Sequence, residues 1–135
     1  MVNYNYEADF NLVDEDKLTN WILDAIKKEG YKIGDINYIF CTDEYLHKLN
    51  VEFLNHDTLT DIISFDYTVG KIIQGDIYIS IDRVRDNAID YGVAFKDELL
   101  RVMIHGVLHF CGYKDKTPDE SKVMRAKEEY YMASY

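Results

Sequence analysis

The segment that most constrains the fold is 99–115, LLRVMIHGVLHFCGYKD. Its apolar residues fall on much of the circumference of a helix, which predicts a central helix buried in the core. His105 and His109 are four residues apart, so they lie on the same face of that helix with Cβ atoms about 5–6 Å apart. Two imidazoles at this spacing can bind one metal ion. The segment therefore predicts a zincin-like metal site on a central helix.

The third metal ligand has to come from beyond this helix. Gly112 can adopt the positive φ that ends a helix and reverses the chain. Asp115, three residues later, is then predicted to return its carboxylate to the two imidazoles. The pattern H-x3-H-x2-G-x2-D thus predicts three ligands and an open fourth position, as in catalytic zinc sites. Asp119 and Glu120 follow closely and stay open as alternatives, although a helix cap is expected to occupy them.

A histidine on an apolar helix is more often a buried core residue than a ligand. The chain has only four histidines, however, and two of them share one helical turn, which favours the metal site. Zinc proteases of the H-E-x-x-H type carry a glutamate base directly after the first histidine, and here that position is Gly106. The sequence therefore predicts a hydrolytic but not proteolytic site, with a metal-bound water as the nucleophile.

Length and composition fit a single domain over residues 1–135. A chain of this length can form one hydrophobic core, and hydrophobic residues make up 47% of it. No segment resembles a signal peptide or has the length of a membrane span. Cys41 and Cys111 are expected to be reduced thiols, Cys111 as a small buried residue. We therefore expect a cytoplasmic protein that does not interact with membranes.

The net charge of −10 argues against a nucleic-acid partner, but the charge is unevenly distributed. Residues 1–100 contain 9 Lys and Arg against 20 Asp and Glu, whereas residues 101–127 contain six basic and three acidic residues. The one basic segment thus surrounds the predicted metal site, where a phosphate backbone would contact it. An ordinary solvated helix face accounts for the same charges equally well.

Periodicity and turn signals predict the order β-α-β-α-β-β-α-α-α. This order indicates an α/β domain with a mixed sheet of about four strands packed with helices. Strands are expected from Val2 toward Phe10 and over 35–41, 62–67 and 75–80, with a loop over 55–61. Helices are expected over 18–26 before a stop at Gly30, after a cap at Thr42, over 82–91 and 99–109, and after Thr117-Pro118.

These residues together resemble the YbeY family of bacterial proteins, single-strand-specific metallo-endoribonucleases of ribosomal RNA maturation. The resemblance covers most of the C-terminal two-thirds of the chain. It is carried by Leu49-Asn50, by 60–65 (TDIISF), 75–80 (GDIYIS) and 105–113 (HGVLHFCGY), and by Met124 and Glu128.

The resemblance implies a zinc ion bound by His105, His109 and the residue at position 115. It also implies an endoribonuclease that acts on single-stranded RNA in ribosomal RNA maturation and ribosome quality control. The implied partners are ribosomal RNA and the ribosome or its associated proteins, with no role for DNA.

The chain departs from the family pattern at two positions. The family usually has a histidine as third ligand, where this chain has Asp115; a carboxylate is an acceptable zinc ligand. Leu54 stands where the family commonly has an arginine associated with RNA binding. Lys114 and Arg125 are the predicted substitutes for that RNA contact.

Two other functions stay open from the residues alone. One is a metallopeptidase or another zinc hydrolase, suggested by the ligand spacing and weakened by Gly106. The other is a non-catalytic ribosome-biogenesis factor whose metal is structural, which a fourth ligand such as Cys111 would favour. No side chain is identified as a general base.

Overall fold

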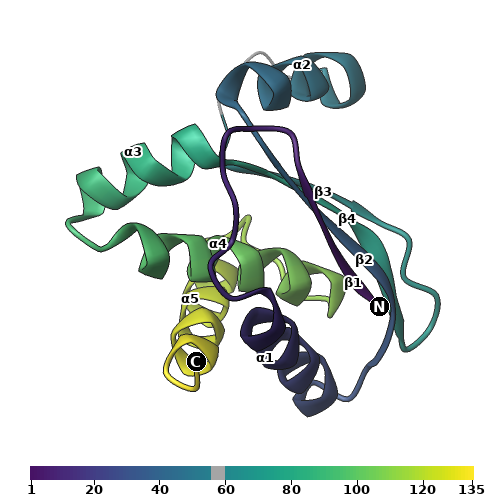
Figure 1. Cartoon of the computed structure of the whole chain (residues 1–135). Coiled ribbons are helices and arrows are strands. Elements are labelled where there is room, and N and C mark those ends of the chain that lie inside the picture. Colours follow the sequence, from purple (N-terminus) through teal and green to yellow (C-terminus); the bar gives the residue numbers. More distant parts are fainter. Residues whose placement is uncertain (56–59) are drawn as a thin grey trace.

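The computed structural model of the chain describes residues 1–55 and 60–135 and contains all nine predicted elements in the predicted order (Figure 1). The strands are β1 (Val2–Tyr6), β2 (Lys32–Cys41), β3 (Ile62–Asp66) and β4 (Ile72–Ser80). The helices are α1 (Glu15–Lys28), α2 (Asp43–Leu54), α3 (Ile81–Tyr91), α4 (Phe95–Phe110) and α5 (Pro118–Met132).

The four strands form one sheet in the order β1-β2-β4-β3. β1, β2 and β4 are parallel, and β3 runs antiparallel to β4 at the edge of the sheet. Parallel neighbours need a crossover connection, and α1 supplies the one between β1 and β2. The predicted fold class, a single α/β domain with a mixed four-stranded sheet, is confirmed.

The two faces of the sheet are covered unequally, because side chains alternate along each strand. From Ile36 to Phe40, every second residue of β2 belongs to the main core together with residues of α1 and α4. On the other face, Leu46 of α2 packs against Cys41 and Ile63 in a smaller cluster. Figure 1 accordingly shows α1, α4 and α5 together on one side of the sheet and α2 apart from them.

Helix α4 is the predicted central helix, and ten of its sixteen residues are buried. It lies close to the sheet because Gly106 has no side chain. A Cβ at this position would lie 3.0 Å from Cδ1 of Ile77 and 3.2 Å from Cδ1 of Ile62. Position 106 therefore faces Ile77 of β4 and Ile62 of β3.

Both predicted N-terminal caps are present. The Thr42 side chain accepts a hydrogen bond from the backbone N–H of Tyr45 at the start of α2. At the start of α5, Thr117 and Glu120 form a full capping box, with Pro118 in the first turn. These local contacts set the first residues of both helices.

Several predicted boundaries were wrong. β1 ends at Tyr6, β2 begins at Lys32 and β4 begins at Ile72. The two longer strands extend because Lys32 and Ile33 pair with Ile72 and Ile73 beyond a bulge between Ile33 and Ile36, which interrupts the run of apolar residues. Most of the predicted loop over 55–61 lies at 56–59, outside the described residues.

Both cysteines are buried and unpaired by disulfides. Burial raises the pKa of each thiol, Cys41 and Cys111, to about 12. A thiol with such a pKa is protonated at neutral pH and is a poor metal ligand, so Cys111 is the small buried residue that the sequence predicted. In the part of the chain that the structure describes, no helix has the length and hydropathy needed to cross a bilayer.

Candidate metal centre

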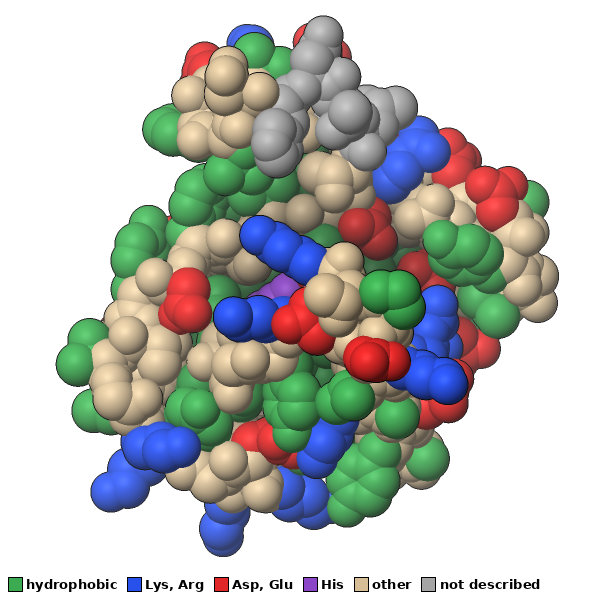
Figure 2. All heavy atoms as spheres, turned by 180° about the vertical axis from the view of Figure 1, so that it is seen from behind, with side chains coloured by type: hydrophobic (Ala, Val, Ile, Leu, Met, Phe, Trp, Pro, Cys, Tyr) green, Lys and Arg blue, Asp and Glu red, His purple; other side chains and the backbone are tan. Residues whose placement is uncertain are grey.

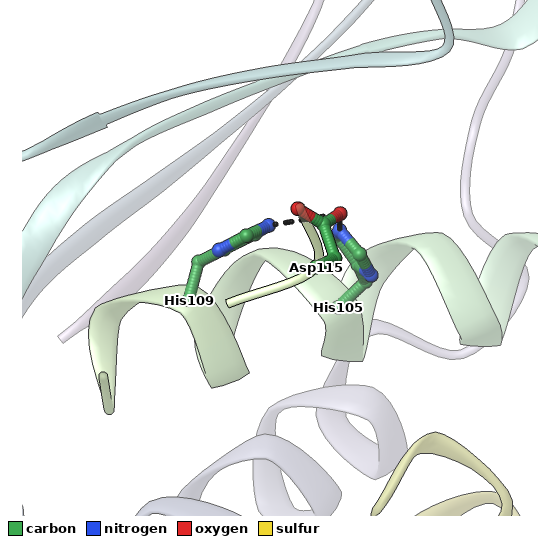
Figure 3. Close-up of side chains that lie close together, drawn as sticks. All are labelled: His105, His109 and Asp115. Carbon is green, nitrogen blue, oxygen red and sulfur yellow. Dashed lines mark ion pairs between the residues drawn. The ribbon is translucent and has the colours of Figure 1, made fainter. Parts of the chain in front are cut away.

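The two histidines of α4 converge with Asp115 at one point (Figure 3). Oδ2 of Asp115 lies 3.2 Å from Nε2 of His105 and 3.5 Å from Nε2 of His109. One ligand atom from each residue lies within 4.8 Å of the others. The helical spacing and the return of the chain after α4 thus bring together the three residues named from the sequence.

Gly112 makes the return of the chain possible. Helix α4 ends at Phe110, and Gly112 takes a φ of 98°, which side chains with a Cβ rarely adopt. Its N–H donates to the carbonyl of His109 at 3.0 Å, and the N–H of Tyr113 donates to that of Leu108 at 3.1 Å. These bonds close the helix end and direct the following residues toward the histidines.

Hydrogen bonds hold the loop that carries Asp115 in place on both sides. The Tyr113 hydroxyl donates to a carboxylate oxygen of Glu29, the residue that follows α1, at 2.7 Å. Lys127 and the Tyr131 hydroxyl, both on α5, donate to the other oxygen of Glu29. Burial opposes ionisation of Glu29, but these hydrogen bonds hold its pKa below the usual value. On the other side, the Ser121 hydroxyl donates to the Asp115 carbonyl at 2.9 Å.

The two alternative carboxylates lie elsewhere. The Glu120 side chain accepts from the N–H of Thr117 at 3.0 Å and is thereby occupied in the capping box. Asp119 and Glu120 line a separate hollow, together with Lys114. Within residues 1–55 and 60–135, the group with metal-ligand geometry consists of His105, His109 and Asp115.

A pocket of about 460 Å³ surrounds the three residues, bounded by β3, α3, α4 and α5. Figure 2 shows a histidine side chain within a hollow, with Lys, Arg and acidic side chains around it. The charged residues of the pocket are Asp61, Glu98, Arg101, Asp115, Arg125 and Glu128. Four carboxylates against two guanidinium groups make the pocket net negative, so a divalent cation would neutralise it and allow a phosphate to approach.

Glu128 contacts Nδ1 of His105, the ring nitrogen that does not face Asp115. Its Oε2 lies 2.6 Å from Nδ1 of His105, and its Oε1 accepts from Arg101 at 3.0 Å. Burial disfavours the charged imidazolium, but the hydrogen bond to Glu128 and the charges of Asp115 and Asp61 raise the pKa of His105. Protons and a metal ion therefore compete for this side chain.

Asp61 is a further carboxyl group of the pocket, immediately before β3. Burial raises its pKa, an effect that the positive charge of His105 opposes. A pocket carboxyl with a raised pKa is a candidate for proton transfer. Sequence reasoning assigned no role to Asp61 or Glu128, although both lie in segments that carry the family resemblance.

The structure separates the two predicted RNA contacts. Arg125 lines the pocket around the histidines, whereas Lys114 lines the neighbouring hollow with Asp119 and Glu120. Among the described residues, Arg125 has no hydrogen bond or ion pair within 4 Å, so its guanidinium group is available to an anion. Leu54 is 42% exposed at the end of α2.

The donor set fits a metal ion. Two imidazole nitrogens and one carboxylate oxygen form a combination found in catalytic zinc sites, where the fourth position stays open. The His105, His109 and Asp115 side chains are partly exposed, at 18%, 30% and 40%. A bound ion would consequently be reachable from the pocket.

Replacing Asp115 by alanine is expected to weaken zinc binding by more than about tenfold, because one of three ligands is lost. Asp115→His should retain zinc, since imidazole is an equivalent ligand. The matched control is Asp119→Ala, which removes a carboxylate from the neighbouring hollow and should leave the affinity unchanged. Competition with a chelating dye measures all four proteins. A larger loss for Asp119→Ala than for Asp115→Ala would refute the assignment.

A family model described as "Endoribonuclease YbeY" matches residues 3–135. A protein of that name from Flavobacterium johnsoniae is 57% identical over 135 residues, which is 100% of this chain and 97% of that protein. One from Bacteroides thetaiotaomicron is 46% identical over 115 residues, 85% of this chain and 84% of that protein.

The fold is also similar to a solved structure. The solution structure of TM1509 from Thermotoga maritima superimposes with a TM-score of 0.73 at 29% sequence identity, covering 98% of this chain and 87% of that chain. The family resemblance that the sequence motifs indicated is thereby confirmed.

Proposed function

The chain belongs to the endoribonuclease YbeY family, and on this premise we propose that it is a zinc-dependent endoribonuclease of single-stranded RNA. Its residues 1–135 would form one hydrolase domain that acts in ribosomal RNA maturation and ribosome quality control in the cytoplasm. Its partners would be ribosomal RNA and the ribosome or its associated proteins. The observation that carries the proposal is the convergence of His105, His109 and Asp115 in a pocket that Arg125 also lines.

The chemistry follows from the residues of the pocket. His105, His109 and Asp115 would hold the ion, which when bound acts as a Lewis acid on a phosphoryl group and acidifies water. Arg125, which lines the pocket, would bind and orient a phosphate of the RNA backbone. Arg101 is less available for this role because it is paired with Glu128 at 3.0 Å and lies 3.8 Å from Glu98.

The two alternative functions are less well supported. A peptidase of the H-E-x-x-H type needs a carboxylate at position 106, but this position faces Ile62 and Ile77 of the sheet. A structural metal site needs a fourth ligand, and Cys111 is a buried thiol with a raised pKa outside the group of converging ligands. The first argument disfavours a peptidase, and the second favours a metal site with an open fourth position.

The zinc-loaded protein is expected to cleave single-stranded RNA in preference to a peptide of similar length. RNA binding should weaken steeply with salt, because phosphate contacts release counterions. Arg125→Glu should lower RNA affinity by about tenfold or more, and Lys114→Glu, outside the pocket, by less. Zinc content should be unchanged in both variants. Fluorescence anisotropy with a labelled RNA at several salt concentrations measures the affinities.

The control is Lys28→Glu, which makes the same charge change at an exposed position of α1 outside this pocket. If Lys28→Glu weakens RNA binding as much as Arg125→Glu does, the effect is one of net charge and the phosphate contact is refuted. Peptide cleavage that is lost in His105→Ala would assign the protein to the peptidases.

A further inference from the structure

The two ring nitrogens of His105 have different partners. Nε2 faces Asp115 at 3.2 Å, while Nδ1 lies 2.6 Å from Oε2 of Glu128. Glu128 comes from α5 and is only 5% exposed. We propose that Glu128, itself oriented by Arg101, is a positioning residue of the metal site that determines which nitrogen of His105 carries the proton. The proposal rests on the metal site of the proposed function and extends it beyond the three ligands.

Hydrogen-bond chemistry determines the direction of this contact. An ionised carboxylate only accepts hydrogen bonds, so Nδ1 of His105 must carry the proton that it donates to Glu128. Nε2 then keeps its lone pair, and this is the nitrogen that faces Asp115. A histidine binds a metal through its unprotonated nitrogen, and the partner of the other nitrogen selects the tautomer. In the opposite tautomer, an N–H bond would point into the metal site.

Arg101 explains why the Glu128 carboxylate keeps this orientation. Arg101 and His105 are four residues apart on α4, so both face α5 from the same side of the helix. Nη1 of Arg101 donates to Oε1 of Glu128 at 3.0 Å, which leaves Oε2 for His105. Nε of Arg101 also lies 3.8 Å from the buried Glu98. The guanidinium group is thus held on both sides and has no acceptor of its own.

A structural role would be simpler: Glu128 would merely join α5 to α4. The substitution Glu128→Gln separates the two roles because it keeps the size of the side chain and both contacts. Arg101 can only donate, so it retains the amide oxygen of the new side chain, and the NH2 group then faces Nδ1 of His105. Nδ1 must accept that hydrogen bond, which moves the proton to Nε2. The helix contact is preserved while the tautomer is reversed.

The experiment measures the tautomer and zinc affinity separately. Long-range ¹H–¹⁵N spectra of the metal-free proteins, at a pH where the imidazole is neutral, should show Nδ1–H of His105 in the wild type and Nε2–H in Glu128→Gln. Zinc affinity, from competition with a chelator, should fall by about 10- to 100-fold in this variant. Adding Arg101→Met frees the amide to turn its oxygen toward Nδ1, so the double variant should regain the wild-type tautomer and most of the affinity.

Two further variants act as controls. Glu129→Gln makes the same charge change at the exposed neighbouring position of α5 and should alter neither measurement. Glu128→Asp keeps the charge but withdraws the carboxylate from Nδ1. It should populate both tautomers and weaken zinc binding, and it provides the test if Glu128→Gln does not fold. An unchanged His105 tautomer in the folded Glu128 variants, or an unchanged zinc affinity, would overturn the proposal.

Neither measurement involves RNA, so this inference and the proposed function fail in different ways. Zinc binding with the expected tautomers but no RNA cleavage would contradict the nuclease function alone. RNA cleavage by a protein whose His105 tautomer does not respond to Glu128 would contradict the positioning role alone.

Discussion

Zinc retention and RNA cleavage are both expected to be lost when His105 or His109 is replaced by alanine. The wild-type protein should hold about one zinc ion per chain in a three-ligand site, and either substitution leaves only two ligands. The ion is expected to supply several kcal/mol of charge stabilisation at the phosphoryl group, which corresponds to on the order of a 10³-fold loss of cleavage rate. Elemental analysis after gel filtration and cleavage of a labelled single-stranded RNA measure the two effects.

His47→Ala is the matched control, since it removes a histidine of α2 outside the pocket. It should retain both zinc and activity, and circular dichroism should confirm that all three variants are folded. Unchanged zinc content in both His105→Ala and His109→Ala would show that these residues do not bind the metal. Zinc loss without loss of RNA cleavage would show instead that the metal is structural.

The second large effect concerns the position between the two histidines. The substitution Gly106→Glu, which creates the H-E-x-x-H motif of zinc proteases, is expected to unfold the protein rather than produce a peptidase. The new side chain would point at Ile77 and Ile62, where even a Cβ would lie 3.0–3.2 Å from their methyl groups. Burying an unpaired carboxylate there should cost at least about 4 kcal/mol. This cost is a large fraction of the free energy of unfolding of a typical protein, which is about 5–15 kcal/mol.

Urea unfolding followed by circular dichroism measures this destabilisation. Gly106→Ala is the control: alanine favours the helix by up to about 1 kcal/mol, and the tip of Ile77 needs to move by only a few tenths of an ångström. Its net effect should therefore stay within about 1 kcal/mol. A stable Gly106→Glu protein that cleaves peptides would show that position 106 reaches the pocket.

The sequence by itself determined the elements and the local part of the site. Periodicity identified all nine helices and strands in order, because amphipathic patterns reflect which side of each element faces the core. His105, His109 and Asp115 lie within eleven residues, so helix geometry and the positive φ at Gly112 suffice to bring them together. The cap at Thr117 likewise depends on neighbouring residues only.

Only the tertiary structure decided what surrounds that local group. The sheet order β1-β2-β4-β3 and the early start of β2 depend on pairing between strands far apart in the chain. Glu128 reaches His105 from 23 residues away on another helix, and Asp61, immediately before β3, lines the same pocket. Packing also separated Arg125, inside the pocket, from Lys114, outside it. Such contacts arise from how the elements pack together. The periodicity of apolar residues along a single segment does not encode that packing.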